Sequence, residues 1–103
     1  LIDQSDIDAV VETLHSDYLT TGPKVKAFEE AIAAYVGSEY CVAVANGTAA
    51  LHLASLVLLN KDEKVLTTPN SFLATSNAIL YAGAKPIFID IAEDGNIDLD
   101  LCA

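Results

Sequence analysis

The sequence predicts an α/β fold in which two leading helices precede a parallel β-α-β-α-β unit. Apolar residues recur at helical spacing in the first third of the chain, and short apolar runs then alternate with segments of helix length. Strands that alternate with helices are typical of a parallel sheet, because parallel strands need a crossover connection. With 103 residues and 52% hydrophobic content, the chain can build about one domain with a real core.

Two helices are expected before the first strand. The first begins after Ser5, whose hydroxyl can cap it, and one of its faces is apolar at the i, i+3, i+4, i+7 positions. The second begins at Gly22-Pro23, since proline is tolerated in the first turn, and ends at Gly37.

Strands and helices are expected to alternate after Gly37. The predicted order is strand 40–45, helix 48–59, strand 64–67, helix 71–81 and strand 86–90. The helix 48–59 is apolar nearly all round, which indicates burial on more than one side, beneath another layer or a partner.

The junction over residues 42–51 is the most informative part of the chain. An apolar run stops there at Asn46-Gly47-Thr48 and passes into a helix. A glycine followed by a small hydroxyl residue lets an anion approach the unpaired N–H groups of the first helical turn. The same residues also fit an ordinary connection in which Asn46 or Thr48 caps the helix and binds nothing.

A second polar junction follows the next predicted strand. In parallel sheets, ligands collect beyond the carboxyl ends of the strands, so residues 46–48 and 67–72 are expected to face one crevice. Phe72, expected in the first turn of its helix, could form one wall of a pocket for a flat ligand. Taken alone, Phe72 fits an ordinary core aromatic better.

Composition excludes several classes of function. Fifteen acidic residues against five basic ones give a formal charge of -10 without a basic stripe, so nucleic acid is not an expected partner. No apolar run approaches the ~20 residues of a membrane span, and no signal segment is visible, so we expect a cytoplasmic protein. Cys41 and Cys102 lack C-x-x-C spacing and are expected to be free thiols.

No metal site is expected. A calcium loop beginning at Asp90 would find its glycine in Gly95, but Ala92 and Leu101 would occupy two ligand positions. The histidines are isolated, and no serine lies in a nucleophile elbow.

Several motifs together resemble a known family. They are residues 19–23, Phe28-Glu29, residues 46–53, residues 68–78 and residues 83–90. In this order they are similar to the DegT/DnrJ/EryC1/StrS family of sugar aminotransferases, which use pyridoxal 5'-phosphate (PLP). The resemblance covers nearly the whole chain. It implies that residues 1–103 are the amino-terminal part of the large domain of the aspartate-aminotransferase fold, PLP fold type I.

The resemblance also implies a cofactor site. Thr48 and Ala49 would donate to the phosphate of PLP at the helix start, Gly47 would shape the turn, and Phe72 would stack on the pyridine ring. Such a platform fixes the ring plane and anchors the phosphate of the cofactor.

The substrate side is implied in the same way. Tyr18, Leu19 and Thr20 would line it, together with Asn46, which also shapes the turn. The parent protein would be a homodimer that transfers an amino group from glutamate to a nucleotide-linked 4-keto-6-deoxy sugar. The loop 93–98 resembles the branch that aminates a UDP-linked 4-keto-6-deoxy-N-acetylhexosamine on the way to pseudaminic acid.

The resemblance places no catalytic residue in this chain. The Schiff-base lysine and the aspartate that pairs with the pyridine nitrogen are expected beyond Ala103. None of the five lysines matches the lysine motif of the family, so this chain alone is expected to be inactive.

Two other hypotheses remain open. The chain could be a small non-catalytic α/β module that binds a phosphate or a nucleotide, although no G-x-G-x-x-G or G-x-x-x-x-G-K turn follows a strand. It could also be a folded segment without any ligand.

Overall fold

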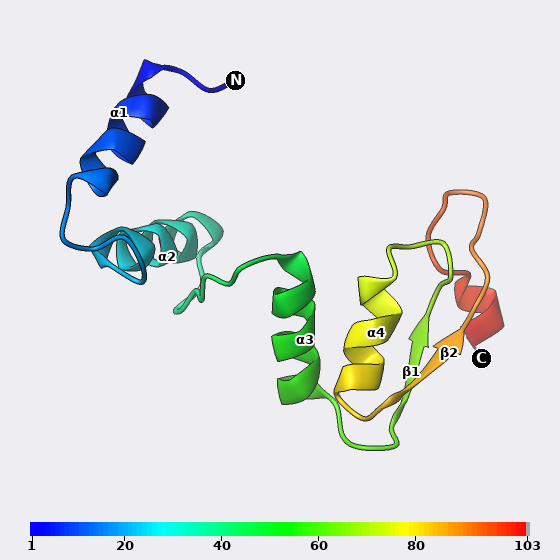
Figure 1. Cartoon of the computed structure of the whole chain (residues 1–103). Helices are drawn as coiled ribbons and strands as arrows, with labels where there is room; N and C mark the ends of the chain where they lie inside the picture. The colour runs from blue at the N-terminus through cyan, green and yellow to red at the C-terminus, as the bar shows by residue number, and fades with distance from the viewer. Residues whose placement is uncertain (103) are drawn as a thin grey trace. The chain divides into compact units, whose positions relative to one another are not determined.

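A computed structural model describes residues 1–102 of the chain. The chain divides into two compact units, Leu1–Ala43 and Val44–Ala103 (Figure 1). Each unit is described by itself below. In the described residues, no helix combines the length and the apolar character needed to cross a membrane.

The first unit consists of the two expected helices, α1 (Gln4–Leu14) and α2 (Pro23–Val36). The prediction that Ser5 caps α1 is wrong, because Asp3 is the capping residue. The Asp3 carboxylate accepts from the Ser5 N–H at 2.8 Å and from the Asp6 N–H at 3.3 Å, and the Asp6 carboxylate accepts from the Asp3 N–H at 2.9 Å. This reciprocal capping box satisfies N–H groups that a lone serine would leave unpaired.

Helix α2 has the boundaries that its sequence predicts. Pro23 occupies the first helical position, and Gly37 ends the helix with a φ of 72°. Glycine adopts this left-handed conformation without the steric penalty of a Cβ atom.

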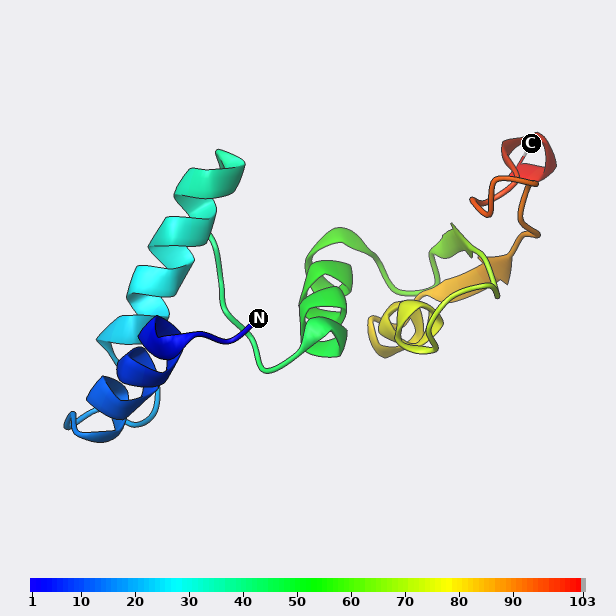
Figure 2. The ribbon, with the colours of Figure 1, turned by 90° about the horizontal axis from the view of Figure 1, so that it is seen from above.

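The second unit is built around a parallel β-α-β crossover. Its elements are α3 (Gly47–Leu58), β1 (Lys64–Thr67), α4 (Ala74–Tyr81), β2 (Lys85–Phe88) and the short 3-10 helix η1 (Leu99–Cys102). The strands pair in parallel from Lys64 opposite Lys85 to Thr67 opposite Phe88. Helix α4 connects the strands and packs against both of them and against α3 (Figures 1 and 2). The predicted parallel arrangement is confirmed for these two strands.

The predicted strand 40–45 is wrong, because residues 40–44 form neither helix nor strand. The sheet of the described residues contains β1 and β2. In place of a strand partner, the Glu29 carboxylate of α2 accepts the Ala43 N–H at 2.7 Å. A strand needs a neighbour to satisfy its backbone, and the apolar run at residues 42–45 predicts an extended segment without specifying that neighbour.

The predicted helix 71–81 begins three residues late, at Ala74. Leu73 is its N-cap and offers no side-chain hydrogen bond, so the first turn lacks the cap that would fix an earlier start. Phe72 therefore precedes α4, and the expectation that it lies in the first helical turn is wrong. The last strand also differs from its predicted range 86–90, because β2 ends at Phe88.

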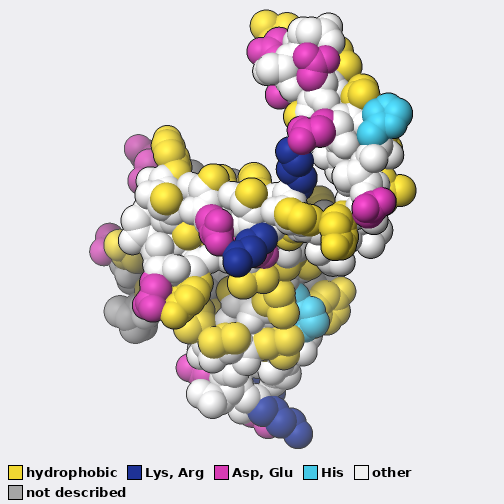
Figure 3. Space-filling view, turned by 90° about the vertical axis from the view of Figure 1, so that its left-hand side faces the viewer, with side chains coloured by type: hydrophobic (Ala, Val, Ile, Leu, Met, Phe, Trp, Pro, Cys, Tyr) yellow, Lys and Arg dark blue, Asp and Glu magenta, His cyan; other side chains and the backbone are white. Residues whose placement is uncertain are grey.

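The buried side chains of the described residues are mostly small. They are Ala33, Thr67, Ala74, Ala78, Ile79 and Ala84. Helix α3 packs chiefly on α4, and its Leu56, Val57 and Leu58 are 50%, 84% and 74% exposed. Hydrophobic side chains lie at the surface over much of the face drawn in Figure 3. Within the second unit, α4 covers one side of α3, and the expected second cover stays a prediction.

Candidate functional site

The start of α3 has a side-chain cap. Asn46 is the N-cap residue, and its Oδ1 accepts the Ala49 N–H at 2.9 Å. This is the capping geometry that the sequence allowed. Among the described residues, no hydrogen bond uses the N–H groups of Gly47 and Thr48 or the Thr48 hydroxyl. The cap formed by Asn46 is therefore compatible with an anion site at the start of α3. The cap uses the Ala49 N–H and leaves the N–H groups of Gly47 and Thr48 available.

The backbone at Gly47 is open. A Cβ atom added at Gly47 would meet nothing within 4 Å, and its φ does not lie in the left-handed region. The packing of the described residues therefore does not require glycine at this position. The open space lies beside the unpaired N–H groups of the first turn of α3, where the helix dipole favours negative charge.

Phe72 is exposed in this chain. Its side chain is 78% exposed, so it is not the core aromatic that the sequence alone favoured. It lines a cavity of about 210 Å³ together with Phe88 at the end of β2 and hydroxyl side chains from the loop and α4. The Ser71 and Thr75 hydroxyls lie 2.9 Å apart, and the Thr68 hydroxyl accepts the Asn70 N–H at 3.2 Å. The loop before α4 is thus held by short local hydrogen bonds.

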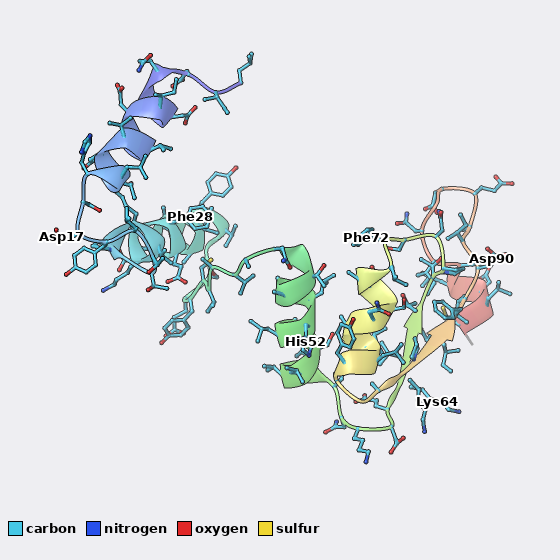
Figure 4. The ribbon with its side chains drawn as sticks, in the orientation of Figure 1. Asp17, Phe28, His52, Lys64, Phe72 and Asp90 are labelled. Atoms are coloured by element: carbon cyan, nitrogen blue, oxygen red, sulfur yellow. The ribbon has the colours of Figure 1, made fainter. Side chains whose placement is uncertain are left out.

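The two polar junctions of the second unit lie at the same end of it. Helices α3 and α4 pack together and run in the same direction in Figure 1, so both begin at one end. Figure 4 shows Phe72 on the loop above the start of α4. The cavity at Phe72 does not include residues 46–48. A shared end is thus observed, and a single pocket that joins both junctions is not.

The predicted substrate residues Tyr18, Leu19 and Thr20 belong to the first unit, on the loop between α1 and α2. Tyr18 and Leu19 are 60% and 64% exposed. Leu19 also lines an apolar cavity of about 430 Å³ with residues of α1 and with Lys24. Asn46, the fourth predicted substrate residue, belongs to the second unit, where its side chain caps α3.

Most lysines lie in surface ion pairs. Lys24 contacts Glu12 at 3.0 Å, Lys26 contacts Glu30 at 3.7 Å, and Lys85 contacts Asp62 at 2.7 Å. No lysine lines the cavity at Phe72. Such exposed pairs contribute little to stability.

The acidic loop after β2 is held by its own hydrogen bonds. The Asn96 side-chain amide donates to Asp94 at 2.9 Å, and this bond lowers the pKa of the Asp94 carboxyl. Within the described part of the chain, no group of three or more His, Cys, Asp and Glu side chains could hold a metal ion. Cys41 and Cys102 are free thiols, as predicted.

Two residues were missed in the sequence, one in the cavity at Phe72 and one in the first unit. Phe88 lines the cavity at Phe72, and its position at the carboxyl end of a parallel strand could have indicated this. Glu29 binds the backbone at Ala43, which no local pattern indicates, since the two residues are fourteen positions apart.

Comparison with known proteins identifies the family of this chain. The model of the DegT/DnrJ/EryC1/StrS aminotransferase family matches residues 1–103. A UDP-4-amino-4,6-dideoxy-N-acetyl-beta-L-altrosamine transaminase of Campylobacter jejuni is 54% identical over 97 residues, which are 94% of this chain and 26% of that protein. The spore coat polysaccharide biosynthesis protein SpsC of Bacillus subtilis is 45% identical over 100 residues, with 95% of this chain and 26% of that protein covered.

Solved structures share the fold. PseC of Helicobacter pylori, an aminotransferase involved in the biosynthesis of pseudoaminic acid, matches with a TM-score of 0.85 and 36% identity over 95% of this chain and 27% of its own. The PLP form of the putative sugar aminotransferase Spr1654 from Streptococcus pneumoniae matches with a TM-score of 0.90 and 34% identity over 99% of this chain and 26% of its own. This chain spans about a quarter of the length of the curated relatives it matches. The predicted α/β fold, as part of the fold of PLP-dependent sugar aminotransferases, is confirmed.

Proposed function

Because this chain belongs to the DegT/DnrJ/EryC1/StrS aminotransferase family, we propose that residues 1–103 are the amino-terminal part of the large domain of a PLP-dependent nucleotide-sugar aminotransferase. The observation that carries this proposal is the 54% identity over 97 residues to the transaminase of Campylobacter jejuni. The complete protein would transfer the amino group of glutamate to the keto carbon of a nucleotide-linked 4-keto-6-deoxy sugar. The products would be the 4-amino sugar and 2-oxoglutarate.

The start of α3 fits the phosphate of PLP. The N–H groups of Gly47 and Thr48 and the Thr48 hydroxyl are unpaired among the described residues, and the space beside Gly47 is open. These groups would bind the phosphate at the positive end of the helix dipole. The N–H of Ala49 is held by Asn46, so Ala49 would donate to the phosphate only by sharing its hydrogen.

Phe72 would bind the pyridine ring. The 78% exposure of Phe72 leaves its ring free to stack on a flat ligand. When bound, PLP supplies an electron sink for the transfer of the amino group. The contribution of this chain would be to orient the ring plane and to anchor the phosphate, while the Schiff-base lysine and the aspartate at the pyridine nitrogen would be supplied beyond Ala103.

Tyr18, Leu19, Thr20 and Asn46 would line the substrate side. The exposure of Tyr18 and Leu19 supports this role, because neither side chain is committed to a core. We propose that the sugar is a UDP-linked 4-keto-6-deoxy-N-acetylhexosamine on the way to pseudaminic acid. The names of the Campylobacter relative and of Helicobacter pylori PseC support this choice.

The proposal includes a cytoplasmic homodimer. The family resemblance implies this assembly, and the exposed apolar side chains of α3 offer surface that further protein could cover.

The proposed function can be tested with the complete protein. We expect it to purify with PLP and to convert a UDP-linked 4-keto-6-deoxy-N-acetylhexosamine and glutamate into the amino sugar and 2-oxoglutarate, as followed by mass spectrometry. Retention of inorganic phosphate without PLP or amino transfer would instead favour a non-catalytic phosphate-binding module.

A further inference from the structure

Gly22 has no room for a side chain beside Tyr18. A Cβ atom built on Gly22 would lie 2.5 Å from the Tyr18 Cβ and 3.3 Å from its Cγ. The first of these distances is well below van der Waals contact between carbon atoms, which is about 3.5–4.0 Å. The Tyr18 Cβ is fixed to the backbone, so a side chain at Gly22 would displace the main chain at Tyr18 and not merely rotate its ring.

Among the described residues, neither backbone conformation nor capping requires glycine at this position. Gly22 is the N-cap of α2 with φ -88° and ψ -171°, a conformation that any residue adopts. It makes no side-chain cap, whereas serine, aspartate or asparagine would stabilise the helix start by accepting an N–H. The contact with Tyr18 therefore accounts for the glycine where backbone conformation and capping do not.

The loop around Tyr18 is held by hydrogen bonds on its α1 side and has an uncommon backbone conformation on its α2 side. On the α1 side, the Ser16 hydroxyl accepts the Tyr18 N–H at 3.2 Å and donates to the Thr13 carbonyl at 2.8 Å. On the α2 side, Thr21 has a φ of 45°. This conformation is uncommon for a β-branched residue, and the surrounding structure must support it. The loop, marked by Asp17 in Figure 4, therefore has a defined shape although Tyr18 is 60% exposed.

We infer that Gly22 is a positioning residue that sets the place of the Tyr18 side chain for the nucleotide-linked sugar. This inference rests on the proposed function, in which Tyr18 lines the substrate side. Because no core holds the ring, its place is set by the backbone beneath it. The missing side chain at Gly22 lets that backbone lie close to the start of α2.

The steric part is tested by melting temperature in the complete protein. We expect Gly22→Ala to lower it clearly in the protein that carries Tyr18. Tyr18→Gly removes the clashing Cβ, so Gly22→Ala should lower the melting temperature much less in that background. Tyr18→Phe keeps the Cβ and should give no rescue. If Gly22→Ala cannot be purified, recovery of folded protein on adding Tyr18→Gly reports the same coupling.

The functional part is tested in the reverse reaction, with UDP-4-amino-4,6-dideoxy-N-acetyl-β-L-altrosamine and 2-oxoglutarate as the probes. We expect Gly22→Ala to raise KM for the UDP-sugar on the order of tenfold, because Tyr18 would be displaced from the sugar. A tenfold change corresponds to a loss of about 1.4 kcal/mol of binding free energy. KM for 2-oxoglutarate and PLP retention should stay unchanged. Gly37→Ala is the matched control, because it strains a left-handed glycine of the same unit that touches no side chain.

The outcomes separate this inference from the proposed function. Equal losses of melting temperature in the Tyr18 and Tyr18→Gly backgrounds would overturn the inference. An unchanged KM for the UDP-sugar in Tyr18→Gly would also overturn it, while PLP loading and amino transfer would still support the proposed function. Failure of the unsubstituted protein to load PLP or to transfer the amino group contradicts the proposed function. The melting temperatures would then test only the steric coupling between Gly22 and Tyr18.

Discussion

Phe72 and Thr48 carry the proposed cofactor site at the level of single residues. The sequence indicated both residues as ligands of the cofactor, but it did not predict the structure around them. Phe72 precedes α4 and is 78% exposed, and Asn46 caps α3, so the Thr48 hydroxyl does not serve as the cap. Each of these facts follows from backbone geometry that a local pattern leaves open.

Replacing Phe72 by alanine should weaken PLP binding more than it weakens the fold. If Phe72 stacks on PLP, its loss should cost roughly 0.5–1.5 kcal/mol of binding free energy in addition to the lost apolar contact. Removal of a packed core aromatic would instead cost about 3–5 kcal/mol of folding stability. At 78% exposure we expect little change in the melting of the apo protein. Tyr35→Ala, at a ring that is 89% exposed, is the control for losing a surface aromatic. Unchanged PLP dissociation with a large loss of apo stability would refute the stacking role.

Thr48→Val should remove one hydrogen bond to the phosphate while nearly preserving volume. A hydrogen bond to a charged group contributes about 1.5–3 kcal/mol, so the dissociation constant of PLP should rise by roughly one to two orders of magnitude. Thr48→Ser keeps the hydroxyl and should stay near the original affinity. Equal PLP retention in the valine and serine variants would exclude the hydroxyl as a phosphate ligand.

Helices and strands differ in how much of them the sequence predicts. Helix α2 could be predicted because proline and glycine mark its ends, and the pairing of β1 with β2 followed from the β-α-β pattern. The strand at residues 40–45 could not, because pairing is non-local and the Ala43 N–H here binds Glu29 instead. The start of α4 was misjudged because Leu73 provides no cap signal.

The cap of α3 should separate the stability of the helix from phosphate binding. Asn46→Ala removes the acceptor for the Ala49 N–H, which should cost about 1 kcal/mol of stability. The same change frees the Ala49 N–H, so affinity for the PLP phosphate should be kept or raised, unlike in Thr48→Val. Asn46→Asp keeps an acceptor but adds negative charge, and it should retain the helix and weaken phosphate binding. Melting curves and PLP titrations of both variants check this, and a loss of PLP affinity in Asn46→Ala without loss of stability would contradict it.

At the scale of the whole chain, many large apolar side chains of the described residues are exposed to solvent. Val57 and Leu58 on α3 and Tyr35 on α2 are each more than 70% exposed, and the sheet of the described residues has two strands. Two-stranded sheets are marginal by themselves, and large exposed apolar patches favour association.

The 103-residue chain should therefore self-associate when it is produced alone. Light scattering over micromolar concentrations should show a mass above that of the 10.9 kDa monomer. The complete protein under the same conditions is the control and should give a single defined species. A stable, folded monomer of the short chain would contradict this account of its surface.

In the proposed function, this chain would bind PLP, and the lysine that bonds to PLP would lie beyond Ala103. Borohydride reduction of the PLP-loaded complete protein, followed by peptide mapping, tests where this lysine lies. We expect one dominant modified lysine at a position beyond Ala103. Dominant modification of any lysine in this chain would contradict the claim; these lysines are Lys24, Lys26, Lys61, Lys64 and Lys85.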